Sequence, residues 1–200
     1  TRTPTATGTA TPTLTSTATP TSIPARSILI NEIAWSGTVA STYDEWIELY
    51  NPHPSPIDLT GWLLEAEDGK PSITLNGTIP AYGFLLLERT DDISFNDTPA
   101  TQIYTGSLEN GGETLRLIGP GGEIVDTANQ DNNEWPAGDG DRHVSMERNA
   151  NAADRPGIWE NSNGLVVQGH DAEGHPINGS PKRVNSVVLF PSTATPTPTH

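Results

Sequence analysis

Carboxylates gather in one glycine-containing segment, where their type and spacing could bind a divalent cation. The stretch DNNEWPAGDGD carries Asp131, Glu134, Asp139 and Asp141. Calcium takes about six to eight oxygen ligands, and acidic loops supply them through carboxylates and accessible carbonyl groups. These four residues are therefore candidate ligands of a calcium ion, the one cofactor that the sequence suggests.

A second acidic segment, DDISFND, carries Asp91, Asp92 and Asp97. Neither segment has the full ligand spacing of an EF-hand loop. Aspartate side chains in turns also accept hydrogen bonds from their own backbone, so solvated turns explain both segments without a metal ion. Both interpretations stay open at the level of sequence.

Histidines and nucleophile motifs give little support for zinc binding or catalysis. His170 and His175 lie five positions apart in a glycine-rich stretch, whereas helical zinc motifs separate their histidines by four. The chain contains no Gly-x-Ser-x-Gly elbow and no Ser-x-x-Lys motif. Carboxylate pairs of the glycosidase type arise by chance in so acidic a chain. We therefore predict that the chain is not an enzyme.

The elements that must position these segments are short β-strands. Ile28, Ile30 and Glu32 alternate along one face of a first expected strand. Leu29 and Ile33 then lie on its other face. Further short apolar runs follow, separated by glycine and proline, and no window has a clear helical period. The pattern indicates an all-β sandwich.

The predicted core consists of the large apolar residues on these strands. Tryptophan contributes most, because each indole buries a large apolar area. Trp135 and Trp159 could instead stack on sugar rings, although we expect them to cover the core. The predicted core residues are Ile30, Ile33, Trp46, Ile47, Leu49, Leu59, Trp62, Leu64, Leu85, Leu87, Leu115, Leu117, Val125 and Met146.

Three motifs resemble the lamin-tail domain family. They are the Asn-Glu-Ile at residues 31–33, the Asp-Glu-Trp-Ile-Glu-Leu-Tyr-Asn at residues 44–51 and the Leu-Thr-Gly-Trp at residues 59–62. Residues 144–148 are similar to the family's Ser-x-x-Arg strand, and Gly179-Ser180-Pro181 with Asn185 to its closing motif, although Lys182 and Arg183 replace small residues there. The resemblance implies an immunoglobulin-like antiparallel β-sandwich, found in nuclear lamin tails and in exported bacterial surface proteins.

Threonine and proline dominate both ends of the chain. Every odd position from Thr1 to Thr21 is threonine, and residues 192–199 repeat the composition. Such segments have little apolar surface to offset the entropy of ordering, which favours extended spacers. We therefore predict spacers over residues 1–25 and 191–200 around a sandwich over 26–190. Candidate O-glycosylation sites are Thr3, Thr5, Thr11, Thr13, Thr19, Thr21, Thr195 and Thr197.

A period of two also places the threonine side chains on one face of a β-strand. A tail of this kind could pair with the exposed sheet edge of a neighbouring subunit. Repeated head-to-tail pairing would produce an open filament. The spacer and the pairing strand are therefore alternatives for the same residues.

The net charge of the chain limits the classes of partner that it could bind. The chain carries −15 at neutral pH, and all 25 acidic residues lie between Glu32 and Glu173. Such a field repels phosphate backbones, so we predict no nucleic-acid partner. No apolar run reaches the roughly twenty residues that span a bilayer, so we predict no membrane insertion in this fragment. Residues 187–190 are expected to form a last strand.

Together these features predict a non-catalytic adhesion or display module in an extracellular or cell-envelope protein. Its partner would be a protein or a glycan on the cell surface. One alternative is a filament subunit that self-associates through its threonine-rich tail. The other is a calcium-binding accessory domain of an exported hydrolase.

Overall fold

Two packed sheets form the body of the computed structural model, which describes residues 23–166 and 168–189. The predicted spacers and their glycosylation sites lie outside these residues, except at positions 23–25. There Ile23 packs against the core, and its backbone N–H donates to the Glu123 carboxylate over 2.9 Å. No helix in the described ranges is both long and apolar enough to cross a bilayer.

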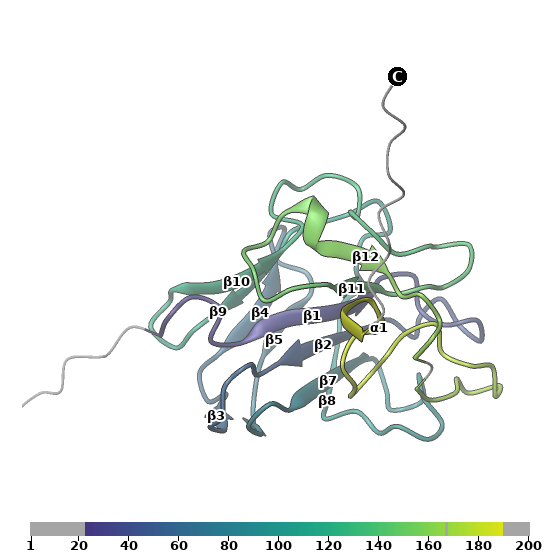
Figure 1. Cartoon of the computed structure of the whole chain (residues 1–200), viewed down its shortest axis with the longest axis horizontal. Coiled ribbons are helices and arrows are strands. Elements are labelled where there is room, and N and C mark those ends of the chain that lie inside the picture. The colour runs from purple at the N-terminus through teal and green to yellow at the C-terminus, as the bar shows by residue number, and fades with distance from the viewer. Residues whose placement is uncertain (1–22, 167, 190–200) are drawn as a thin grey trace, which may run out of the picture.

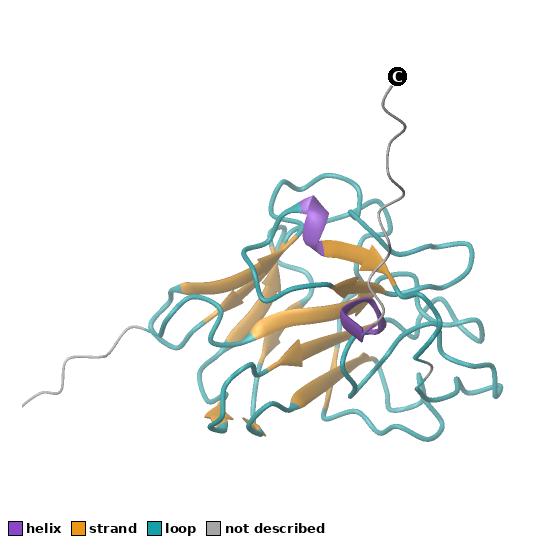
Figure 2. Ribbon diagram, in the orientation of Figure 1, coloured by secondary structure: helices purple, strands orange, loops and turns teal. Residues whose placement is uncertain are grey.

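The larger sheet has six strands in the order β12-β11-β1-β2-β7-β8 (Figures 1 and 2). All its pairs are antiparallel except β7 with β8. Its strands are β1 (Leu29–Ala34), β2 (Trp46–Tyr50), β7 (Phe84–Arg89), β8 (Gln102–Tyr104), β11 (Met146–Arg148) and β12 (Trp159–Asn161).

The smaller sheet has four antiparallel strands in the order β10-β9-β4-β5, and β3 and β6 form a two-stranded ribbon. A 3₁₀ turn at Pro156–Ile158 and the helix α1 (Ser186–Leu189) complete the described elements. The remaining strands are β3 (Ile57–Asp58), β4 (Leu63–Ala66), β5 (Ser72–Thr74), β6 (Thr78–Ile79), β9 (Leu115–Ile118) and β10 (Ile124–Ala128). This architecture confirms the predicted all-β, immunoglobulin-like sandwich.

The core draws its residues from both sheets. Every predicted core residue is buried, and all except Trp46 belong to one continuous cluster. Trp46 packs instead with Phe95, Leu86 and Ile177 in a second cluster. Because neighbouring strand residues point to opposite faces, this second cluster lies on the other face of the six-stranded sheet. That face is covered by loop residues, so the sheet is buried on both sides.

A β-bulge interrupts the alternation of faces that is expected for the first strand. The register between β1 and β2 shifts between Ile30 and Glu32. A bulge adds one residue to a strand, so Ile30 and Ile33 both reach the main core. Glu32 is thereby displaced from the face of Ile30 that the alternation predicted.

The predicted last strand is wrong. Residues Ser186–Leu189 form α1, which Figure 1 shows in front of the six-stranded sheet, and Phe190 lies outside the described residues. The buried carboxylate of Glu147 explains the difference. Its Oε2 accepts the Ser186 hydroxyl over 2.7 Å and the Val187 backbone N–H over 3.1 Å. These first-turn donors therefore need no strand partner.

Candidate binding groove

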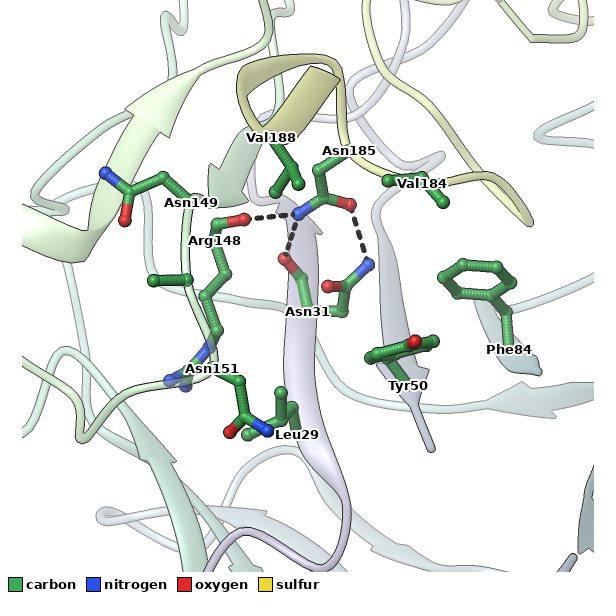
Figure 3. A pocket seen from close by; sticks show the side chains of 11 residues that line it. Leu29, Asn31, Tyr50, Phe84, Arg148, Asn149, Asn151, Val184, Asn185 and Val188 are labelled. Atoms are coloured by element: carbon green, nitrogen blue, oxygen red, sulfur yellow. Dashed lines mark hydrogen bonds between the residues drawn. The ribbon is translucent and has the colours of Figure 1, made fainter. Parts of the chain in front are cut away.

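A groove of about 220 Å³ opens on the covered face of the six-stranded sheet (Figure 3). Its walls come from segments far apart in sequence: β1, the end of β2, the start of β7, residues 148–151 and residues 184–188. We call this hollow the groove.

An aromatic pair forms one end of the groove. Tyr50 and Phe84 lie opposite each other where β2 pairs with β7. Their ring centroids are 4.9 Å apart and the ring planes differ by 29°. Both side chains are half-buried, so part of each ring faces the groove. This end offers a flat apolar surface.

Two amides connect the walls of the groove (Figure 3). Asn31 Nδ2 donates to Asn185 Oδ1 over 2.7 Å. Asn185 Nδ2 donates in turn to the backbone oxygens of Asn31 and Arg148, over 3.0 and 2.9 Å. Asn185 thus fastens the last described segment to β1 and β11. Val184 and Val188, which flank it, remain nearly half exposed at the rim of the groove.

Three glutamates lie side by side on the sheet next to these amides, and we call them the acid row. Glu147 pairs with Glu32 across β11 and β1, and Glu32 pairs with Glu48 across β1 and β2. All three are fully buried. Burial and the neighbouring carboxylates raise the pKa of Glu32 well above its ordinary value. Burial is also the main cause that raises the pKa of Glu48, to about 8.

The Arg148 side chain leaves the groove and crosses to the smaller sheet. Its Nη2 donates to Asp126 Oδ2 on β10 over 2.8 Å, and its Nε donates to the Ile30 backbone oxygen over 2.8 Å. Burial raises the pKa of Asp126 to about 6, although Arg148 opposes that shift. Arg148 therefore stabilises the fold, and its guanidinium is not available to a ligand in the groove.

Residues 21–132 match the family model described as Lamin Tail Domain. The chain belongs to the lamin tail domain family. A search of curated proteins finds no match. The family is a non-catalytic, immunoglobulin-like one, which agrees with the fold. The matched segment ends before β11 and α1, so two walls of the groove lie beyond it.

The lamin tail domain does not gather the predicted calcium ligands into a metal-binding group. Asp139 forms an ion pair with Arg142, with Nη2 and Oδ2 2.6 Å apart, and this contact lowers the pKa of Asp139. Asp131, Glu134 and Asp141 are exposed. Among residues 23–166 and 168–189, no cluster of three or more acidic, histidine or cysteine side chains could hold a metal ion. The calcium site stays a prediction without geometric support.

The second acidic segment makes local and histidine contacts. Asp92 Oδ1 accepts the Ala100 backbone N–H over 2.7 Å. Asp97 Oδ2 lies 2.9 Å from His170 Nδ1, and Asp171 Oδ2 lies 3.1 Å from His175 Nδ1. The two histidines thus each contact a different aspartate.

Trp135 and Trp159, for which the sequence allowed either core packing or stacking on sugars, are part of the core cluster. Trp135 donates its indole N–H to the Glu109 backbone oxygen over 2.8 Å, and Trp159 donates to Asp154 Oδ1 over 2.7 Å. They are 9% and 4% exposed, so neither presents a ring face to a sugar. An aromatic surface that does open to a hollow is the Tyr50 and Phe84 pair in the groove.

Sequence reasoning missed both the groove and the acid row. One signal for the acid row was present: Glu32, Glu48 and Glu147 each stand in the middle of an expected strand. Alternation placed Glu32 on the face of Ile30, and nothing local indicates that residues 179–189 cover the opposite face, where the three glutamates meet.

Proposed function

We propose that this lamin tail domain is a non-catalytic binding module of an exported cell-surface or secreted protein, and that its groove binds a surface glycan. The groove carries the proposal, because it combines aromatic faces with amide groups. Pockets that recognise small ligands commonly pair an apolar lining with a few oriented polar groups. Extracellular placement draws its support from the threonine and proline composition of the chain ends.

The dimensions of the groove suit one ring-sized unit. Its volume of about 220 Å³ lies below the roughly 300–1,000 Å³ of pockets for drug-sized ligands. The Tyr50 and Phe84 rings would stack on the apolar face of a sugar ring. Asn149 and Asn151 line the opposite side. Asn149 Nδ2 already donates to Glu160 Oε1 over 2.7 Å, so its Oδ1 would accept a hydrogen bond from a sugar hydroxyl, and the Asn151 amide would both donate and accept.

A glycan array with the full chain tests this function, followed by calorimetry on the best ligand. Replacing Tyr50→Ala should weaken binding roughly tenfold, the equivalent of about 1.4 kcal/mol. Tyr82→Ala is the matched control, because Tyr82 is 58% exposed and does not line the groove. Thermal melts would verify that both variants fold. The proposal fails if no glycan binds, or if Tyr82→Ala weakens binding as much as Tyr50→Ala does.

A further inference from the structure

Among residues 23–166 and 168–189, the hydrogen bonds to the acid row come from neutral donors. Glu32 Oε1 accepts the Ser145 hydroxyl over 2.6 Å and the Ser180 backbone N–H over 2.8 Å. Glu48 accepts the Asn31 amide over 2.9 Å and the Lys182 backbone N–H. The donors found among the described residues are thus hydroxyls, an amide and backbone groups. The Lys182 ammonium donates elsewhere, to the Pro99 backbone oxygen.

One hydroxyl bridges two members of this row. Ser180 Oγ lies 3.0 Å from Glu32 Oε2 and 2.9 Å from Glu147 Oε1. A hydroxyl carries a single proton, so it can donate to one of these carboxylates only. The other contact becomes a hydrogen bond when the carboxyl group itself is protonated and donates to Ser180 Oγ. Two neighbouring carboxylates in a buried site also resist ionising together.

The acid row also holds the last described segment of the chain on the sheet. We call residues 179–189 the C-terminal strap. Its backbone N–H groups at Ser180, Lys182 and Val187 donate to Glu32, Glu48 and Glu147 respectively. The same strap supplies Val184, Asn185 and Val188 to the wall of the groove. The charge state of the acid row therefore bears directly on whether the groove is intact.

We propose that a proton on Glu32, at its contact with Ser180 Oγ, latches the C-terminal strap onto the sheet, and that losing it detaches the strap and dismantles the groove. The part of this proposal in which the latch regulates ligand binding rests on the proposed function of the groove. As a property of the fold, it stands on the hydrogen bonds alone.

The charged groups around the acid row do not supply a replacement for the proton. On β12, Glu160 pairs with Glu147 and adds another carboxyl group. On β7, Glu88 is buried beside Trp46 and is likewise acidic. The charge of Lys182 on the strap acts on Glu48, although more weakly than burial does. The Arg148 guanidinium is engaged with Asp126. Ionising the whole row would therefore leave uncompensated negative charge under the strap.

The direction of the effect follows from burial. The pKa of Glu32 is raised well above its ordinary value of 4.5, first by burial and then by Glu147 and Glu48. A group whose pKa is raised on folding stabilises the folded arrangement at low pH and ceases to do so as pH rises. The strap is therefore latched in acidic solution and is released as pH rises through the raised pKa of Glu32.

Hydrogen exchange of the full chain, read by mass spectrometry between about pH 6 and pH 9 and corrected for intrinsic rates, tests the latch without any ligand. Strap opening should increase up to tenfold per pH unit through the transition, which is the dependence of a one-proton release. Peptides from β9, in the other sheet, should show a weaker pH dependence, because they respond only to the general loss of stability. Equal pH dependence in the strap and in β9, or none in the strap, would overturn the proposal.

The variant Glu32→Gln supplies the decisive comparison. Its amide is neutral at every pH, accepts from Ser145 and Ser180 through its oxygen, and donates to Ser180 Oγ through its nitrogen. It should keep the strap protected at pH 9, whereas Glu134→Gln, at an exposed position, should behave like the parent chain. Glu147→Gln repeats the test if Glu32→Gln does not fold. Unchanged pH dependence in the acid-row variant would refute the latch. Failure of glycan binding alone would leave the latch standing.

Discussion

At the scale of single residues, Arg148 joins the two sheets. From β11 it contacts Asp126 on β10 and the backbone oxygen of Ile30 on β1. Its guanidinium also lies over the Trp159 ring, 4.7 Å from the centroid. The arrangement uses the planar fork of arginine, which the single ammonium of lysine cannot reproduce.

Arg148→Lys should therefore lower the free energy of unfolding by about 3–5 kcal/mol, the usual cost of breaking a buried ion pair. Urea unfolding followed by tryptophan fluorescence measures this loss. The matched control is Arg116→Lys, because Arg116 and its partner Glu67 are both substantially exposed. Its effect should stay below about 1 kcal/mol. Similar losses in both variants would contradict a special role for Arg148.

At the scale of elements, the C-terminal strap depends on a close approach to the sheet at Gly179. A Cβ atom there would lie 2.6 Å from Glu32 Oε1 and 2.8 Å from Trp46 Cζ2. Those neighbours are buried, so they cannot move aside without disturbing the acid row. Position 179 therefore requires glycine, because a Cβ atom would overlap Glu32 and Trp46.

Gly179→Ala should displace the strap and cost about 1–3 kcal/mol, as overpacking commonly does. Limited proteolysis should then cut within residues 179–189 earlier than in the parent chain. Gly111→Ala is the control, since a Cβ at Gly111 meets no atom within 4 Å. Equal protease resistance of the two variants would show that attachment of the strap does not depend on the close approach at Gly179.

At the scale of the whole molecule, buried carboxyl groups set the response to pH. Burial is the main cause that raises the pKa of Glu45, Glu88 and Glu113, each to about 7 from an ordinary value of 4.5. Their stabilising effect is complete below about 4.5 and is lost as pH rises through 7. At the acid end, hydrogen bonds lower the pKa values of Asp58 and Asp97, so stability falls again below about pH 4.

The melting temperature should accordingly be highest near pH 5 and several degrees lower at about pH 8.5. Differential scanning calorimetry at constant ionic strength measures the profile. Holding ionic strength fixed matters, because the net charge of −15 also destabilises the compact state through repulsion. A profile that rises from pH 5 to pH 8.5 would show that these carboxyl groups are ionised in the fold.

The comparison of sequence with structure separates local from distant information. Alternating apolar residues predicted the strands and every member of the predicted core, because period-two patterning is a local property. The bulge at β1 was not predictable, since an extra residue leaves no mark on residue type. The groove was missed because Asn31 and Asn185, which join its walls, are 154 positions apart. The buried role of the acid row depends on the same distant segment.

The attachment of the strap also determines how the domain bears tension. A pull between Ile23 and Leu189 passes from β1 into the strap through the Asn31 and Asn185 amides and the acid row. The N-terminal end of this path is also tied to the smaller sheet, because the Ile23 N–H donates to Glu123 and the Arg26 N–H donates to the Val125 backbone oxygen over 2.7 Å. The strap would yield first and release roughly 35 Å of slack, at about 3.3 Å per residue. A rise in pH that weakens the latch would therefore lower the force at which the strap detaches.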